Sequence, residues 1–218
     1  MTRVPIDPAG WPFVGGALGL ALGVGLFISW PLSLPLVIAA GALGLFFRDP
    51  DRAIGAHHHD AVLSPADGRV MVAGPAADTT APAGPQWLQV SIFLSPLNVH
   101  VNRVPVSGRV TSVTYRPGRF LPAYRRDAAT LNERSEIWID HDGQSVVARQ
   151  IVGVLARRGG CRTTPGADVR AGDRYGVMKF GSRMDVFLPS TAEIRVQVGD
   201  IVRGGETIIA VLHSRFRP

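Results

Sequence analysis

The sequence has very little lysine and cysteine, and each shortage limits what the protein can be. Lys179 is the only lysine, so the formal net charge of +6 comes almost entirely from arginine. Cys161 is the only cysteine, which excludes an internal disulfide and leaves the compartment undecided. No interleaving of aromatic and basic residues typical of nucleic-acid binding stands out. The positive charge suits an anionic partner. We predict that this partner is an acidic membrane face and that the protein does not bind nucleic acid.

Charged residues are absent from residues 11–47. This apolar run is too long for one helix, and residues 29–35 contain two prolines, which remove backbone donors and stop helices. We predict a hairpin with arms at residues 11–30 and 32–47. A bilayer span needs about 20 residues and at least about 17, so the first arm is long enough and the second is marginal. Whether the hairpin spans the bilayer or dips into it stays open.

The flanks of the hairpin predict its orientation. Trp11 and Trp30 are expected interface anchors, and Arg48 and Arg52 follow the second arm. The positive-inside rule then places the remaining chain at the cytoplasmic face of the cell membrane. A buried core hairpin is the alternative. A cleaved signal peptide is disfavoured because the run is too long and no clear cleavage site follows.

Short strands are predicted after residue 60, because apolar and polar residues alternate between Pro-Ala-Asp-Gly, Asp-Gly and Gly-Gly turns. Strong helical periodicity is missing from this part. The expected strands are residues 62–64, 69–73, 87–94, 108–115, 136–140, 145–154, 184–188 and 194–198.

A weak internal repeat adds to this prediction. Val-Arg-Ala-Gly-Asp at residues 169–173 returns as Val-Gln-Val-Gly-Asp at 196–200, each followed by an apolar strand. The repeat resembles the hammerhead strand pairs of lipoyl and biotinyl domains. We predict a mainly β fold, a β-sandwich or flattened barrel with lipoyl-like hammerhead elements, preceded by the apolar helical hairpin. The expected domains are residues 1–50 and 51–218.

Three consecutive histidines at residues 57–59 raise the question of a metal site. Three adjacent side chains cannot converge on one ion without a contorted backbone, and no cysteine or carboxylate cluster is spaced to help. We therefore expect a solvated loop and no metal. His141 and His213 are expected to be structural.

Phe-Gly-Ser-Arg-Met-Asp-Val-Phe-Leu-Pro at residues 180–189 is the most informative string. A Gly-Ser pair entering a strand is by itself typical of a tight turn. The whole string, however, resembles a segment of the short bacterial phosphatidylserine decarboxylases. Four more segments resemble that family in order and spacing: Phe-Phe-Arg-Asp-Pro at 46–50, Ser-Pro-Ala-Asp-Gly at 64–68, Phe-Leu-Ser-Pro-Leu-Asn-Val-His-Val-Asn-Arg-Val-Pro at 93–105 and Asn-Glu-Arg at 132–134.

The resemblance implies a proenzyme that cuts its own Gly181–Ser182 bond, leaving a β chain of residues 1–181 and an α chain of residues 182–218 as a heterodimer. Ser182 would become a covalent pyruvoyl group, which forms a Schiff base with the substrate amine. The implied reaction makes phosphatidylethanolamine and carbon dioxide from phosphatidylserine in the membrane.

The resemblance also implies site residues. His100 is expected to manage protons and Asp67 to orient and charge-stabilise it. Some longer members carry a second histidine at the position of Arg103, so the base for self-cleavage stays open. Arg103 could bind a phosphate or carboxylate, or be a surface charge. Glu133 and Arg134 could form an ion pair that shapes a loop.

Two other functions remain open at this point. The motifs concern the serine headgroup, so they do not separate phosphatidylserine from another serine-headed lipid such as archaetidylserine. A non-catalytic, membrane-tethered lipoyl-like β module is the alternative from another class. A higher oligomer is also left open.

Overall fold

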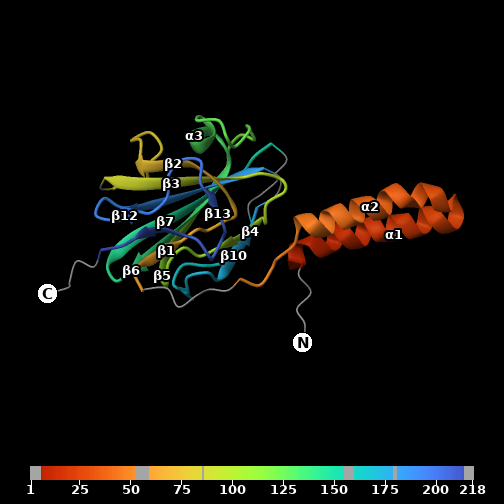
Figure 1. Cartoon of the computed structure of the whole chain (residues 1–218), viewed down its shortest axis with the longest axis horizontal. Coiled ribbons are helices and arrows are strands. Elements are labelled where there is room, and N and C mark those ends of the chain that lie inside the picture. Colours follow the sequence, from red (N-terminus) through yellow and green to blue (C-terminus); the bar gives the residue numbers. More distant parts are fainter. Residues whose placement is uncertain (1–5, 53–58, 85, 155–159, 179–180, 214–218) are drawn as a thin grey trace.

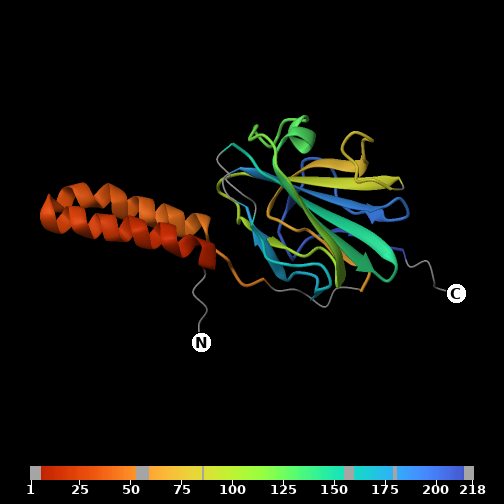
Figure 2. The same ribbon diagram turned by 180° about the vertical axis from the view of Figure 1, so that it is seen from behind.

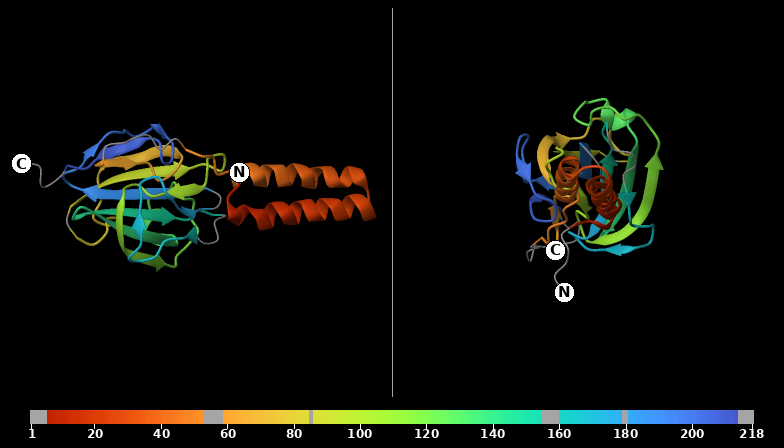
Figure 3. Two further views of the ribbon diagram at one scale, coloured as in Figure 1. Left: turned by 90° about the horizontal axis from the view of Figure 1, so that it is seen from below. Right: turned by 90° about the vertical axis from the view of Figure 1, so that its right-hand side faces the viewer.

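The computed structural model describes residues 6–52, 59–84, 86–154, 160–178 and 181–213. A pair of antiparallel helices projects from one end of a β domain (Figures 1 and 3). The prediction of a mainly β fold preceded by an apolar helical hairpin is confirmed.

The hairpin consists of α1 (Trp11–Phe27) and α2 (Trp30–Phe46), and the 3₁₀ turn η1 (Pro8–Gly10) precedes α1. The predicted position of its break was wrong, because the chain turns at Ile28 and Ser29 and both prolines lie inside α2. Pro31 is tolerated because it lies in the first turn, where backbone N–H groups have no intrahelical acceptor. Pro35 removes one further donor, and the helix continues past it.

Most large side chains of the hairpin are exposed, so the alternative of a buried core hairpin is wrong. Leu26, Phe27 and Trp30 at the tip are 69%, 87% and 74% exposed. Residues 8–27 form a helical stretch long and apolar enough to cross a membrane, whereas α2 is shorter. The exposed apolar surface of both helices fits burial in lipid.

The β domain is built around an eight-stranded antiparallel sheet that curls into a half-barrel (Figure 2). Its strand order is β13-β2-β3-β11-β7-β6-β5-β9, and three-stranded sheets with orders β1-β14-β12 and β4-β10-β8 complete the domain. The strands are β1 (Ala61–Leu63), β2 (Gly68–Pro75), β3 (Trp87–Leu94), β4 (Val101–Arg103), β5 (Gly108–Arg116), β6 (Arg134–His141), β7 (Gln144–Ile151), β8 (Gly160–Cys161), β9 (Asp168–Val169), β10 (Arg174–Val177), β11 (Ser182–Pro189), β12 (Glu193–Ile194), β13 (Ile201–Val202) and β14 (Ile208–Val211). A single short helix, α3 (Ala128–Leu131), follows the hairpin in the described part of the chain.

Strand β11 occupies the middle of the large sheet, between β3 and β7. Met184, Val186 and Leu188 point into the main core, which also contains Ile92 and Ala148. Because side chains alternate along a strand, the residues between them face the other side of the sheet. All side chains from Ser182 to Leu188 are buried, so this strand is held from both faces.

The sequence repeat forms two matching turns. The Asp173 carboxylate accepts from Arg170 N at 2.9 Å, and the Asp200 carboxylate accepts from Gln197 N at 2.9 Å. Each turn also bonds a valine backbone N–H, that of Val104 to Asp173 O and that of Val70 to Asp200 O. Strands β10 and β13 follow the two turns, so the repeat predicted real local structure.

The segment after α2 fastens the hairpin to the β domain. Asp7 N donates to Phe47 O at 2.8 Å, which ties the two ends of the hairpin together. The Asp49 carboxylate then pairs with Arg174 and, at 3.3 Å, with Arg103. The two ends of the hairpin and the β domain therefore lie on the same side of any bilayer that the hairpin enters.

Candidate active site

Ser182 is the first residue of β11 and is fully buried. It pairs with Leu94, the last residue of β3. Its side chain shares the inner face with Met184, whereas Arg183 faces outward, where it donates to the carboxylate of Asp185 at 2.6 Å. The serine therefore lies at one end of the inner face, inside the curl of the sheet.

Gly181 precedes this serine in a left-handed conformation, with φ of +69°. A side chain added there would meet no heavy atom within 4 Å, so the backbone conformation, rather than space, favours glycine. Beside it lies an apolar hollow of about 220 Å³ lined by Phe93, Pro96, Pro122, Ala123, Tyr124, Val154 and Gly181.

His100 is buried just before β4 and is covered by the Phe46 ring, whose centroid lies 4.1 Å away. Its Nδ1 lies 2.8 Å from Asn98 O. A carbonyl only accepts, so Nδ1 carries the proton and Nε2 carries the lone pair. Nε2 is buried and has no hydrogen-bond partner among the described residues.

The environment of His100 keeps the ring neutral. Burial lowers its pKa from 6.5 to about 4, the nearby Arg48 charge acts in the same direction, and the bond to Asn98 and the Asp67 charge oppose it. A neutral imidazole with a free Nε2 lone pair can accept a proton at neutral pH. Met178 N donates to His100 O at 3.0 Å, which places the histidine beside Met178, three residues before Gly181 in the sequence.

Asp67 is held by groups other than His100. Arg52 donates to both its carboxylate oxygens, at 2.8 and 3.0 Å, and Gly204 N donates to Oδ1 at 2.8 Å. The structure therefore shows no hydrogen-bonded triad of Ser182, His100 and Asp67. Asp67 acts on His100 through space, as a negative charge that raises its pKa.

Arg103 is 4% exposed, so the alternative of a surface charge is wrong. Its guanidinium donates to Gly172 O at 3.0 Å, Pro50 O at 3.1 Å and Asp49 Oδ1 at 3.3 Å. These contacts hold the segment after the hairpin against the β domain. The Arg134 side chain likewise donates to Thr130 O and lies near Glu136, so the suggested Glu133–Arg134 ion pair is not formed.

Buried polar residues that were not predicted as site residues lie on the same inner face or, like Asn102 of β4, contact it. Ser135 donates to Gln150 at 2.6 Å, and Gln150 donates to Asn102 Oδ1 at 2.8 Å. Asn102 Nδ2 and Glu133 Oε1 are buried without a partner in the described part of the chain. By continuation of the sheet register, Glu133 falls in the same row as Ser182, two strands away. The signal for Gln150 was a polar side chain in the inward-facing series that also contains Val146 and Ala148. Asn102 and Glu133 lie inside matched strings.

Comparisons with known proteins agree with this geometry. The sequence model for phosphatidylserine decarboxylase matches residues 41–210. The phosphatidylserine decarboxylase proenzyme of Nitrosomonas europaea is 41% identical over 205 residues, which cover 94% of both chains. The proenzyme of Geotalea daltonii is 40% identical over 211 residues, covering 96% of this chain and 97% of the relative.

The chain belongs to the phosphatidylserine decarboxylase family. The predicted resemblance is thus confirmed, and a relative in Mycobacteroides abscessus, 42% identical over 215 residues, carries the same proenzyme name. Family membership argues against a purely structural β module.

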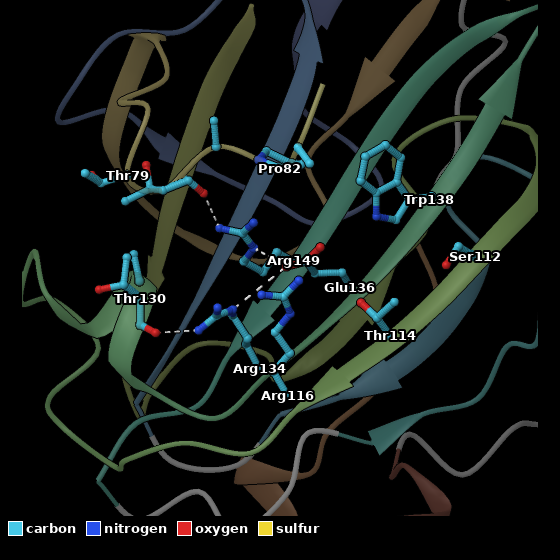
Figure 4. Close-up of a pocket in the computed structure, with 14 residues that line it drawn as sticks. Thr79, Pro82, Ser112, Thr114, Arg116, Thr130, Arg134, Glu136, Trp138 and Arg149 are labelled. Carbon is cyan, nitrogen blue, oxygen red and sulfur yellow. Dashed lines mark hydrogen bonds and ion pairs between the residues drawn. The ribbon is translucent and has the colours of Figure 1, made fainter. Parts of the chain in front are cut away.

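A larger hollow of about 500 Å³ lies on the outer face of the sheet (Figure 4). Arg134, Glu136 and Arg149 point into it, and Arg149 donates to Glu136 at 2.9 Å and to Thr80 O at 2.5 Å. These side chains occupy the face of the sheet opposite Ser182. This hollow is therefore separate from Ser182, the serine in the string that resembles the decarboxylase family.

Proposed function

We propose that this chain is a self-cleaving, pyruvoyl-dependent decarboxylase that converts phosphatidylserine to phosphatidylethanolamine and carbon dioxide. The observation that carries the proposal is the pair Gly181–Ser182, in which a left-handed glycine precedes a buried serine at the start of the central strand. The pair lies within the stretch matched to the family, residues 41–210. The relatives at about 40% identity are named proenzymes, which fits activation by cleavage.

Self-cleavage would begin with attack of Ser182 Oγ on the carbonyl carbon of Gly181. The peptide C–N bond breaks, an ester forms, and the hydroxyl proton ends on the released amine. Elimination then transfers the Cα proton of residue 182 to a base and breaks the Cβ–Oγ bond, leaving a carboxylate on Gly181 and dehydroalanine at position 182. Water replaces the nitrogen, which leaves as ammonia, and the α chain then begins with a pyruvoyl group.

The surrounding residues fit such a group. A pyruvoyl ketone supplies a sink for the electron pair that is released when carbon dioxide leaves. His100 Nε2 offers a lone pair for a proton, Asn102 Nδ2 offers a donor, and Glu133 Oε1 offers an acceptor, all buried without partners in the described part of the chain. These groups would bind and orient the serine headgroup and return a proton to the product.

Asp67 and Arg103 have supporting roles in this proposal. Asp67 contributes negative charge near His100 and holds Arg52 and the backbone of Gly204. Arg103 is a positioning residue that keeps Asp49 and Pro50 against the domain. A direct contact of Arg103 with the headgroup would require it to release these partners.

The membrane part of the proposal rests on the hairpin. Its exposed apolar surface would enter the cell membrane, with the β domain at the cytoplasmic face. Arg48 and Arg52 lie on the domain side of the hairpin, as the positive-inside rule requires, although Arg48 donates to Leu97 O and Arg52 pairs with Asp67. The substrate headgroup would then lie close to the site without leaving the bilayer.

Carbon dioxide release from phosphatidylserine in detergent micelles tests the proposed reaction. The parent protein should release it, and Ser182→Ala should not. Ser190→Ala is the matched control, because Ser190 is exposed and lies in the same α chain. A parent chain that cleaves itself but releases no carbon dioxide from phosphatidylserine would overturn the substrate assignment, and archaetidylserine would be the next substrate to assay.

A further inference from the structure

We propose that His59, Asp60 and His141 form a binding site for a divalent transition-metal ion of the zinc class. The possible ligand atoms of these three residues all lie within 4.8 Å of one another. His59 and Asp60 immediately precede β1, whereas His141 ends β6. The site therefore joins two segments that are far apart in the sequence.

His141 is the strongest part of the argument. The residue is 2% exposed, and its Nδ1 lies 2.7 Å from Ser107 O. Because a carbonyl only accepts, Nδ1 is protonated and the lone pair is on Nε2. This Nε2 is buried and has no hydrogen-bond partner among the described residues. Metal-binding histidines are commonly oriented in this way, with the other ring N–H given to a backbone carbonyl or carboxylate.

The spacing of the remaining atoms fits a small tetrahedral ion. Asp60 Oδ1 lies 3.9 Å from His141 Nε2 and 3.7 Å from His59 Nδ1, and Asp142 Oδ2 lies 3.5 Å from the same His59 atom. Metal–ligand bonds of about 2.0–2.2 Å place tetrahedral ligands roughly 3.3–3.6 Å apart. Asp142 or water could supply the fourth ligand. Two imidazoles with carboxylate oxygens favour zinc over magnesium or calcium.

Ring stacking and ion pairing explain the cluster of His59, Asp60 and His141 less completely than a bound metal ion does. The rings of His59 and His141 stack with centroids 4.6 Å apart, and the carboxylates could pair with a protonated His59. Neither contact gives His141 Nε2 a partner, because 3.9 Å to Asp60 is too long for a hydrogen bond. The sequence had led us to expect no metal, because consecutive histidines cannot converge. The present site uses only one residue of that tract, and residues 57 and 58 lie outside the described part.

The position of the site predicts a structural role. Arg134, at the start of β6, shares the row of Ile151 and Arg183 across the sheet, whereas His141 lies at the other end of that strand. An ion there would fasten the segment before β1 to the turn between β6 and β7. It would stabilise the β domain without contacting Ser182.

Cobalt(II) titration of the metal-free, full-length protein in detergent tests the site, with zinc(II) as the competitor. We expect one cobalt ion per chain, visible absorption typical of tetrahedral cobalt, and displacement by zinc. His141→Gln and His59→Gln should each weaken binding by at least about 10-fold. The control His213→Gln should bind like the parent, because His213 lies outside the cluster.

The variants separate the outcomes. Unchanged cobalt affinity in His141→Gln would overturn the proposal, because the ion would then be held by the histidine tract alone. No stoichiometric cobalt binding by the parent would also overturn it. If His141→Gln does not fold, the exposed His59→Gln decides: zinc should raise the unfolding temperature of the parent and leave that of His59→Gln unchanged, whereas equal shifts would contradict the site.

Discussion

At the scale of single residues, two buried histidines are oriented in the same way, by a hydrogen bond to a backbone carbonyl. His100 donates Nδ1–H to Asn98 O and His141 donates Nδ1–H to Ser107 O, and both leave Nε2 buried without a partner in the described part of the chain. The backbone thus fixes each tautomer. An aromatic ring, Phe46 in one case and His59 in the other, packs against each imidazole.

Replacing His100 should remove most decarboxylation. We expect His100→Ala to lower kcat by about 100- to 10,000-fold, the usual effect of losing a proton carrier. The matched control is His213→Ala, because His213 is not in the site and lies 3.9 Å from Glu193. The measurement is carbon dioxide release by protein that has already been processed. Parent-like turnover in His100→Ala would show that another group carries the proton.

Burial of neutral His100 should make the fold sensitive to acid. Its pKa is about 4 in the folded chain, against 6.5 for an unperturbed histidine, so the unfolded chain binds more protons between these values. The free energy of unfolding should therefore fall as the pH falls from 6.5 to 4, by up to about 3 kcal/mol.

Urea unfolding of the uncleaved Ser182→Ala chain in detergent at several pH values measures this effect. The additional substitution His100→Gln should flatten the dependence between pH 4 and 6.5, because glutamine does not titrate. An equally steep dependence in that variant would place the responsible group elsewhere.

Short sequence motifs predicted Gly181, Ser182 and His100 as candidate site residues. They did not predict which groups the charged residues would bind. Asp67 precedes a turn glycine, and nothing near it in the sequence indicates that Arg52 would occupy its carboxylate. Arg103 binds Asp49 only because β4 lies beside the segment after α2. Such pairings depend on long-range packing, which a single sequence does not display.

At the scale of secondary structure, β11 is the strand that the proposed cleavage affects most. Cleavage would place a new chain end at the start of this central strand. Ser182–Pro189 pairs along its length with β3 and, from Arg183 to Phe187, with β7. Residues 182–218 also supply β12, β13 and β14. Strands of the proposed α chain therefore pair with strands of the β chain within the same sheets.

The two proposed chains should consequently stay together after cleavage. Affinity purification through a tag on the β chain should retain the α chain in non-denaturing detergent and release it in concentrated guanidinium. The reason is that separation would expose the buried face of β11 and break both of its ladders. Loss of the α chain during native washing would contradict this account of the heterodimer.

The longer strands were predicted better than the short ones. Alternation and flanking turns located β3 and β5, which have eight and nine residues, within about a residue. The three-residue β4 was missed, since Asn102 and Arg103 are polar residues buried by tertiary contacts. Of the predicted strand 194–198, only Ile194 lies in a strand, β12, because the following residues enter the Gly199–Asp200 turn.

The hairpin should anchor the protein through lipid insertion rather than charge. Full-length protein should remain in the membrane fraction through high salt and require detergent for release, because salt screens arginine contacts but leaves apolar burial intact. A chain beginning at Asp49 should need no detergent and should act poorly on substrate in bilayers. Release of the full-length protein by salt alone would contradict insertion.

Phe46→Ala in the full-length protein is the control for that truncation. Truncation removes both the apolar surface and the ring that covers His100, whereas Phe46→Ala removes only the ring. We expect Phe46→Ala to stay membrane-bound and to lose activity in micelles as well as in bilayers. A truncated chain that fails to cleave would show that the hairpin also supports the fold of the β domain.

At the scale of the whole molecule, the helical hairpin joins the β domain at one end (Figure 3), and the contacts of His100 place the candidate site at this junction. Phe46 from the end of α2 contacts His100, and Arg48 donates to Leu97 O in the loop that joins β3 to His100. Ser182 pairs with Leu94 at the start of that loop. The arrangement places the proposed chemistry beside the surface from which a lipid headgroup would arrive.

Self-cleavage is the central claim, and intact mass analysis of the purified protein tests it most directly. We expect two species, the smaller of about 4 kDa in proportion to its share of the 23.3-kDa chain, with a blocked N-terminus that reacts as a carbonyl. Ser182→Ala should give one species of full length. A parent protein that stays at 23.3 kDa, or an α chain that begins with an ordinary serine amine, would contradict the account.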